Sequence, residues 1–231
     1  MATTARRIQT SVSKSGKPVE IVRPTINYLV VTIKGTAPLL QNPKTKAYLD
    51  QITGSGEGKA APAKTLKDPE TEYFARLKQT KDGIGLVPVE AFTGRKGAFP
   101  TAARLAKLKK ISSTAVLAGV KVKPDVMLEF ADGIRGYLLL QNASRPVNDR
   151  HIAEINKMGQ SIPVPIYRPR YDEWELTLHI SYWPNLVSLS NLMSLLATMG
   201  EAGIGSWRPE NGGTFGTFKL TSAMELSGGF D

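Results

Sequence analysis

Three stretches of the chain alternate apolar with polar side chains, which is the pattern of a β-strand with one buried face. They are residues 27–35, 174–182 and 215–221. In the last stretch Phe218 and Leu220 point to one face, while Lys219 points to the other together with Phe215 and Thr217. Residues 27–35 are expected to begin the folded domain.

Leucines and methionines at helical spacing predict a helix over residues 187–200, with a core stripe that ends in glycine. Residues 68–78 predict a short helix, because Asp68 suits the N-cap and a proline occupies the first turn. Residues 84–87 predict a short apolar strand. A helical pattern follows it up to Ala106, and glycines and a proline interrupt this pattern.

An Asp-Gly turn between two apolar runs predicts a β-hairpin within residues 125–141. The prolines of residues 162–169 confine that run to a sheet edge or an extended loop. The order strand, helix, hairpin, strand, helix, strand predicts an α+β, ferredoxin-like fold, with an antiparallel sheet packed on two helices as in RNA-recognition domains. We expect one domain over residues 26–222, preceded by a flexible basic arm (1–25) and followed by a tail (223–231).

Charge adds a prediction about the partner. Thirty basic and twenty acidic residues give a formal net charge of +10, and residues 91–124 hold eight bases and no acid. These bases are Arg95, Lys96, Arg104, Lys107, Lys109, Lys110, Lys121 and Lys123. From Tyr171 onward acids outnumber bases, so one side of the molecule is expected to be electropositive. Nucleic acid is the leading partner, and a solvated surface kept for solubility is the alternative.

Several functional classes lack support in the composition. The chain has no cysteine and only two histidines, so disulfides, thiolate chemistry and a zinc site are not expected. No phosphate-binding P-loop or nucleophile elbow is present, and no cofactor or metal is predicted. No apolar run is long enough for a membrane span or a secretory signal, which predicts a cytoplasmic protein.

Residues 203–220, GIGSWRPENGGTFGTFKL, raise the question of a glycine-rich binding loop. Glycines let backbone amides approach a phosphate and form an anion-binding nest, which Trp207 and Arg208 could extend by stacking and pairing. The alternative is a helix C-cap with a tight return into the last strand. That alternative accounts for Gly200 and Gly203 but leaves the later glycines unexplained. A neighbouring subunit is a further possible contact.

The predicted phosphate contacts include Arg95 and Lys96 near a helix start, where the helix dipole reinforces them. Lys34 and Lys219 are expected to line a groove on the sheet face opposite the core, where Tyr28 and Phe215 could stack bases. The complete predicted nucleic-acid-binding set is Lys34, Arg95, Lys96, Arg104, Lys107, Lys109, Lys110, Gly203, Gly205, Trp207, Arg208, Gly213, Phe215 and Lys219.

Gly-Ile-Gly at residues 203–205 and Gly-x-Phe-Gly-x-Phe at 213–218, between a helix and a terminal strand, resemble the signature of the RAMP superfamily of CRISPR effector complexes. PVEAFTGRKGAF (88–99) resembles the motif that begins the first helix of its backbone subunits. The resemblance implies a protein that coats single-stranded RNA as a filament, alongside other effector subunits. It also implies a thumb-like insertion, for which residues 41–67 or 141–160 are candidates.

PLLQNP, RPRYDEWELT and the glycine-rich loop also resemble a bacteriophage and mobile-element family of unassigned function. A relative of that kind could coat single-stranded RNA or DNA without any guide. It could instead be a structural or assembly subunit that docks neighbouring copies and binds no nucleic acid.

Catalysis is the remaining alternative. Some RAMP proteins are metal-independent endoribonucleases that use a histidine, which makes His151 and His179 the candidates here. His179 lies on the polar face of a predicted strand, and His151 lies at a predicted helix start among charged residues, so neither has the surroundings of a general base. We therefore expect a single-stranded nucleic-acid-binding protein that forms oligomers or filaments and is not an enzyme.

Overall fold

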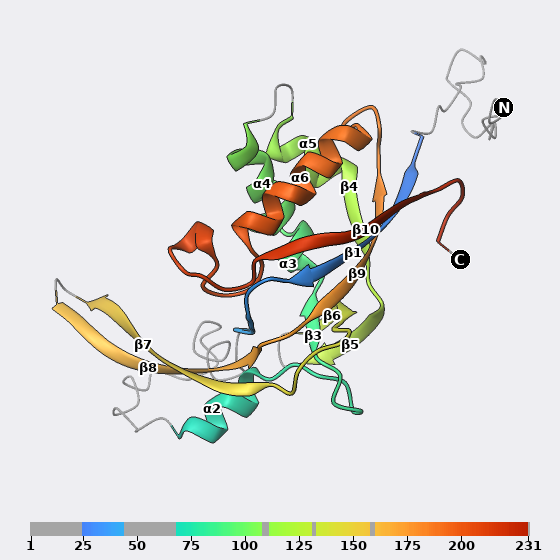
Figure 1. The fold of residues 1–231 in the computed structure, drawn as a ribbon. Coiled ribbons are helices and arrows are strands. Elements are labelled where there is room, and N and C mark those ends of the chain that lie inside the picture. Colours follow the sequence, from blue (N-terminus) through green and yellow to red (C-terminus); the bar gives the residue numbers. More distant parts are fainter. Residues whose placement is uncertain (1–24, 44–67, 108–110, 131–132, 158–159, 231) are drawn as a thin grey trace, which may run out of the picture.

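The computed structural model describes residues 25–43, 68–107, 111–130, 133–157 and 160–230. Its largest sheet has four strands in the order β10-β1-β9-β4, and all neighbouring strands are antiparallel. These strands are β1 (Asn27–Gly35), β4 (Val120–Lys123), β9 (Glu175–Tyr182) and β10 (Phe218–Leu226). Helices connect the first strand to the second and the third to the fourth, so the predicted ferredoxin-like α+β fold is confirmed (Figure 1).

The two central strands carry the core of this sheet. Alternate residues of β1 and β9 are fully buried, as the period-two pattern predicts. Phe218 at the start of β10 completes this buried face beside Trp174. Trp174 is itself fixed, because its indole N–H donates to the carbonyl of Ala37 at 2.9 Å and its ring lies against Gly35.

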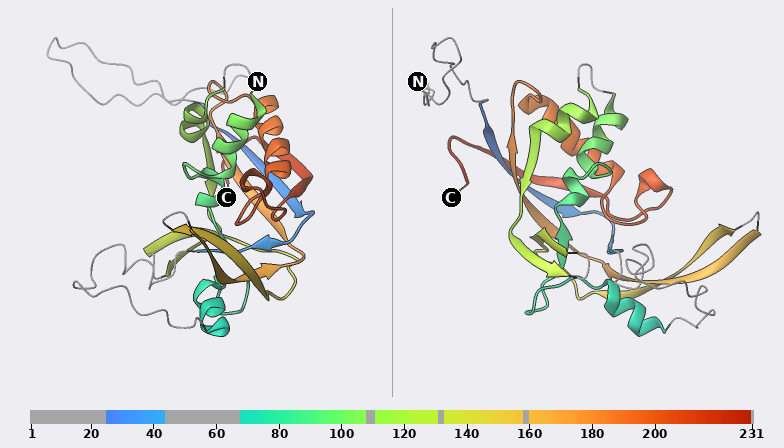
Figure 2. Two further views of the ribbon diagram at one scale, coloured as in Figure 1. Left: turned by 90° about the vertical axis from the view of Figure 1, so that its left-hand side faces the viewer. Right: turned by 180° about the vertical axis from the view of Figure 1, so that it is seen from behind.

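Helices cover one face of the four-stranded sheet (Figure 2). They are α3 (Glu90–Thr93), α4 (Ala98–Ala106), α5 (Ser113–Gly119) and α6 (Leu189–Ala202). α4 packs against both α5 and α6, and its first six residues are buried. The predicted helical run before Ala106 is two helices, because the segment Gly94–Gly97 breaks it. α6 continues through Gly200 and ends at Ala202, where Gly203 takes a positive φ of 75°.

We call the opposite face of this sheet the outer face. It is formed by Tyr28, Val30, Thr32, Lys34, Lys121, Lys123, Glu175, Thr177, His179, Ser181, Lys219 and Met224. No helix in the described part of the chain lies over it (Figures 1 and 2). The register between β1 and β10 shifts by one residue between Thr32 and Ile33, where Thr221 forms a bulge in β10.

Two smaller sheets occupy the connections. One consists of β2 (Leu39–Leu40), β8 (Gln160–Tyr171) and β7 (Val147–Lys157), and the other of β3 (Leu86–Pro88), β6 (Gly133–Leu139) and β5 (Val126–Phe130). The β7–β8 hairpin projects from the body, and α2 (Pro69–Arg76) packs against β8 (Figure 1). The buried amide of Gln41 joins these parts by donating to the carbonyls of Lys78 and Leu86.

Several sequence predictions can now be compared with the structure. Asp68 is the N-cap of α2 as expected, since its carboxylate accepts from the amide of Thr71 at 2.8 Å. His151 lies in β7, so its prediction at a helix start is wrong. β10 begins at Phe218, so Phe215 precedes the strand and is not on the outer face. β10 also extends to Leu226, through the first residues of the predicted tail.

Two predicted segments fall largely outside the described residues. They are the basic arm at 1–25 and the candidate thumb-like insertion at 41–67. Within the described residues, no helix is long and apolar enough to cross a membrane.

The central strands predict a test of the core. Leu178 of β9 is fully buried, so Leu178→Ala is expected to lower the free energy of unfolding by about 2–5 kcal/mol through lost burial and a residual cavity. Urea denaturation followed by circular dichroism measures this change. Ser190→Ala, at an exposed position of α6, is the control and should shift stability by less than about 0.5 kcal/mol. Equal effects of the two substitutions would contradict the assigned core.

Candidate nucleic-acid interface

The glycine-rich loop between α6 and β10 folds back on itself at very short backbone distances. A Cβ atom on Gly213 would lie 1.8 Å from the carbonyl oxygen of Trp207, and one on Gly216 would lie 1.9 Å from that of Ile204. Gly203, Gly205 and Gly216 also have positive φ angles of 75°, 77° and 73°. Close approach and left-handed backbone therefore explain these glycines without any ligand.

The loop amides mostly donate within the chain. The N–H of Gly203 donates to Met199 O at 2.8 Å, that of Gly213 to Arg208 O at 3.1 Å, and that of Gly216 to Pro38 O at 2.8 Å. The predicted anion-binding nest is therefore wrong for these three amides, because their hydrogens are already used. Of the three loop glycines in the predicted binding set, only Gly205 has an amide without a hydrogen bond to the described part of the chain.

Arg208 connects the loop to the segment between α3 and α4. Its guanidinium donates to the carbonyl oxygen of Lys96 at 3.1 Å and to the Glu210 carboxylate at 2.8 and 2.5 Å, and only 12% of its side chain is exposed. Arg104 of α4 reaches the same carboxylate, with an N···O distance of 3.4 Å. The prediction of Arg208 as a phosphate contact is thus corrected, because the side chain holds two protein segments together.

Four of the predicted bases lie at the two ends of α4. Arg95 and Lys96 are exposed in the turn before the helix, Arg104 is half exposed near its end, and Lys107 follows with a positive φ of 46°. We call these four residues the α4 basic patch. Lys109 and Lys110 fall outside the described residues.

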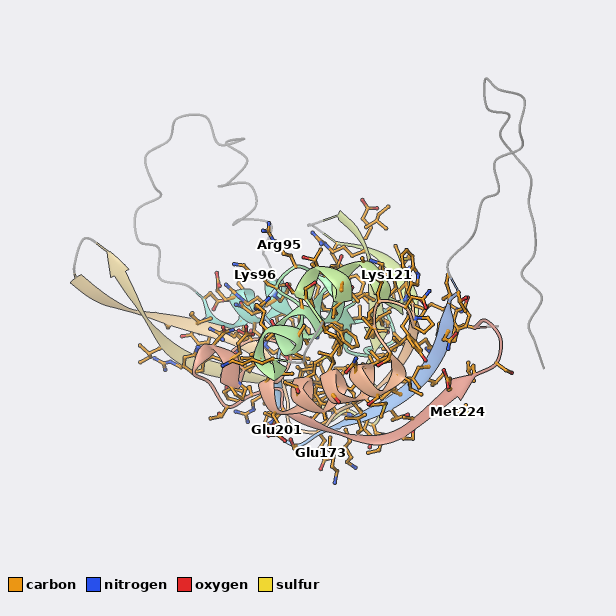
Figure 3. The ribbon with its side chains drawn as sticks, turned by 90° about the horizontal axis from the view of Figure 1, so that it is seen from above. Arg95, Lys96, Lys121, Glu173, Glu201 and Met224 are labelled. Carbon is orange, nitrogen blue, oxygen red and sulfur yellow. The ribbon has the colours of Figure 1, made fainter. Side chains whose placement is uncertain are left out.

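Three bases of the acid-free run and two acids lie on opposite sides of the molecule. Seen from above, Arg95, Lys96 and Lys121 lie on one side, and Glu173 and Glu201 lie on the other (Figure 3). Glu210 is the acid that ion-pairs with Arg104 of the α4 basic patch. This side of the molecule can therefore attract a polyanion.

Lys34 and Lys219 form a separate group. They are directly opposite each other on β1 and β10, on the outer face, so the structure does not bring them together with the α4 basic patch. Lys34 pairs with Glu175 at 3.2 Å. Hydrogen bonds from Asn142 and then from Lys34 lower the pKa of the Glu175 carboxyl, so this acid stays charged beside the lysine.

Trp207 stands where the loop meets the long hairpin. The Arg168 guanidinium of β8 lies 5.7 Å from the Trp207 ring and donates to the Ser206 hydroxyl at 3.0 Å. Burial lowers the pKa of Arg168, and the charge of Arg76 lowers it further. Phe215 donates its amide to the carbonyl of Trp207 at 3.1 Å, so both aromatic residues belong to the loop.

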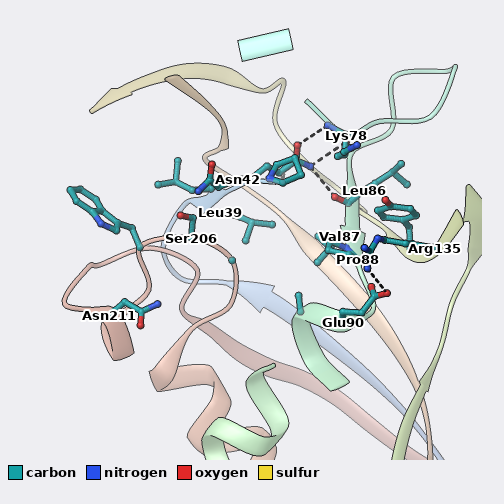
Figure 4. Close-up of a pocket in the computed structure, with 17 residues that line it drawn as sticks. Leu39, Asn42, Lys78, Leu86, Val87, Pro88, Glu90, Arg135, Ser206 and Asn211 are labelled. Carbon is teal, nitrogen blue, oxygen red and sulfur yellow. Dashed lines mark hydrogen bonds and ion pairs between the residues drawn. The ribbon is translucent and has the colours of Figure 1, made fainter. Parts of the chain in front are cut away.

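A pocket of about 510 Å³ lies beside the loop. Leu39, Leu86 and Tyr137 contribute to its walls, the Glu90–Arg135 ion pair closes one end, and Ser206 and Asn211 lie at the other (Figure 4). Its walls come from β2, β3, β6, α3 and the loop. Sequence reasoning missed the pocket, because these elements carry no shared local motif. It also missed Arg168 and Glu210, whose roles depend on distant contacts.

The described part of the chain offers no cluster of metal ligands. Among the described residues, no group of three or more histidine, aspartate and glutamate side chains could hold a metal ion. His179 lies on the outer face, with its Nδ1 atom 3.9 Å from the Asp125 carboxylate.

Comparisons with known proteins find structural similarity but no match of sequence. No family model and no curated protein matches the sequence. A cryo-EM structure of the Type III-B Cmr-beta bound to cognate target RNA aligns over 87% of this chain, with 11% identity and a TM-score of 0.49. The chain spans 61% of that neighbour's length. Cmr6 from Pyrococcus furiosus aligns over 84% of this chain and 98% of its own, with 9% identity and a TM-score of 0.40.

The loop geometry predicts unequal costs for two glycine substitutions. Gly216→Ala combines a positive φ with contact against Ile204 O, so it should destabilise the protein by about 2–4 kcal/mol. Gly212→Ala has a similar φ of 76° but no atom within 4 Å of the new Cβ, so about 1 kcal/mol is expected. Chemical denaturation of both variants measures the difference. Equal losses would show that close backbone packing does not hold the loop.

Proposed function

We propose that the chain binds single-stranded nucleic acid through sequence-independent phosphate contacts, made chiefly by the side chains of the α4 basic patch. The observation that carries the proposal is the hydrogen bond from Arg208 to the carbonyl of Lys96 at 3.1 Å. It joins the glycine-rich loop to the turn that bears Arg95 and Lys96, although the two segments are about a hundred residues apart. Arg95 and Lys96 of the turn, and Trp207 and Phe215 of the loop, were predicted from sequence to contact the same ligand.

Charge and aromatic residues favour a single strand as the ligand. Exposed arginine and lysine side chains supply the attraction for phosphates, and their binding releases counterions. Trp207 and Phe215 lie in the adjoining loop, and unpaired bases can stack on aromatic rings that a duplex would not reach. Because the loop amides are used internally, the phosphate contacts come from side chains. Contacts of this kind read the backbone of the strand and not its sequence.

We extend the proposal to assembly along the strand, as the resemblance to backbone subunits implies. The β7–β8 hairpin projects from the body and overlaps the candidate thumb-like insertion at 141–160 (Figure 1). A projecting hairpin offers a neighbouring copy a contact that leaves the α4 basic patch accessible. In this proposal the chain acts by binding and assembly, and it carries out no catalysis.

Removing the two exposed bases of the turn before α4 tests the proposal. Arg95→Ala with Lys96→Ala should weaken binding to a labelled 15-nucleotide single-stranded RNA and make the salt dependence shallower. Each lost phosphate contact should reduce the slope of log K against log salt by about 0.7 for a single strand. Fluorescence anisotropy over a salt series measures both quantities.

The matched control is Lys81→Ala with Arg145→Ala. It removes the same charge at exposed positions on other connections and should leave the salt slope close to that of the unaltered protein. An unaltered protein that fails to bind at low salt would overturn the proposal. An equal loss in the two double variants would mean that net charge alone is responsible and that the patch is misplaced.

A further inference from the structure

The outer face of the four-stranded sheet brings two rings and an ammonium group onto adjacent strands. Tyr28 of β1 pairs with Ser181 of β9, and two residues earlier on β9 is His179, which pairs with Lys123 of β4. All of these side chains project from the same face. Tyr28, His179 and Lys123 therefore surround one small area, which we call the aromatic seat.

An aromatic ring of the same chain occupies this seat. After β10 the segment 227–230 returns over the outer face, and the Phe230 ring lies 5.0 Å from Tyr28 and 5.3 Å from His179 between centroids. The interplanar angles of 82° and 80° are those of edge-to-face pairs. The Lys123 ammonium lies 5.6 Å from the Phe230 centroid, within range of a cation–π contact.

Few contacts hold the segment that carries Phe230. Residues 227–229 are exposed, and a Cβ atom on Gly228 or Gly229 would meet nothing within 4 Å. The ring contacts of Phe230 therefore account for most of what keeps the segment on the sheet. A competing planar group of similar size could displace it without disturbing the strands beneath.

Both lysines and carboxylates lie around the seat, and the carboxylates have partners within the chain. Lys121, Lys123 and Lys219 are exposed on this face, while Glu175 is paired with Lys34 and Asp125 lies beside His179. Glu225, at the end of β10, is held by Tyr182 and Asn27. Lys121 and Lys123 are the lysines nearest the two rings, where they could meet the phosphates on either side of a bound base, whereas Lys219 lies towards the other end of the sheet.

We propose that the aromatic seat binds an unpaired nucleobase of a single strand, and that Phe230 is its intramolecular occupant. This inference rests on the proposed function, to which it adds a second contact region on the opposite face of the sheet. A base offers the two features that Phe230 presents, a flat face and a polarised edge, and adds ring nitrogens and carbonyl oxygens that accept from Lys123. Phe230 and the base compete for the same place.

Two oligonucleotides of equal length separate base contacts from phosphate contacts. One is a 12-nucleotide uridine RNA, and the other is a 12-unit abasic strand with the same phosphates. Phe230→Ala should bind the uridine strand about 3- to 10-fold more tightly than the unaltered protein. The reason is that the edge-to-face contacts of Phe230 with Tyr28 and His179 no longer compete with the base. Its affinity for the abasic strand should be unchanged.

Two further variants complete the experiment. Tyr28→Ala in the Phe230→Ala background should remove the gain for the uridine strand. Ser227→Ala, on the same segment but without a ring, should behave like the unaltered protein on both strands.

The outcomes distinguish this inference from the proposed function. If the unaltered protein binds both strands and Phe230→Ala changes neither affinity, or raises both equally, the nucleobase seat is wrong and the phosphate interface stands. If neither protein binds either strand, both proposals fail. If Phe230→Ala instead forms dimers in light scattering without gaining affinity for the uridine strand, the face docks a second copy and the nucleobase assignment is overturned.

Discussion

The contact between the Arg208 guanidinium, the Glu210 carboxylate and the carbonyl of Lys96 fixes the position of the candidate interface. It joins the loop after α6 to the turn before α4, and Arg104 adds a second cation to the same carboxylate. The side chain of Arg208 is mostly shielded from water, where such charge-assisted hydrogen bonds are strongest. Without it, Arg104 and Thr101 would still connect Glu210 to α4, but the turn that carries Arg95 and Lys96 would lose this hydrogen bond to the loop.

The glycine-rich loop has a mainly structural role in this arrangement. Its glycines allow backbone segments to approach more closely than a side chain would permit, and most of their amides donate within the chain. The loop in turn carries Ser206 and Trp207, which contact Arg168 at the base of the long hairpin. Interface, loop and hairpin are thus connected through specific side-chain contacts.

Local patterns predicted the elements that are amphipathic over a single stretch. β1, β9 and α6 each bury alternate or helically spaced residues, and such periodicity is visible without any partner. β7 was misread around His151, because the identity of that strand depends on its pairing with β8. β8 contains Pro163, Pro165 and Pro169, and these were expected to limit it to an edge or a loop. It pairs along its length with β7, but with β2 only at Leu39 and Leu40.

The sequence indicated which basic residues belong to the candidate site, but not which partners they contact. The acid-free run 91–124 pointed to a basic surface, and Arg95 and Lys96 are exposed there. Glu210 is only two residues from Arg208, but the sequence could not show that it would also engage Arg104, which is 106 positions away along the chain. The sequence also could not predict the pocket beside the loop or the contact of Phe230 with Tyr28. Each is made by segments that only the fold brings together.

Photo-crosslinking to a 4-thiouridine-containing single-stranded RNA, followed by mass spectrometry of the attached peptides, tests the central claim most directly. A short-range crosslink reports which side chains lie beside the bases, independently of net charge. The account predicts crosslinked peptides from the turn at 94–97 and from the loop at 203–217. Crosslinks confined to α2 and the exposed side of α6, or none at low salt, would contradict it.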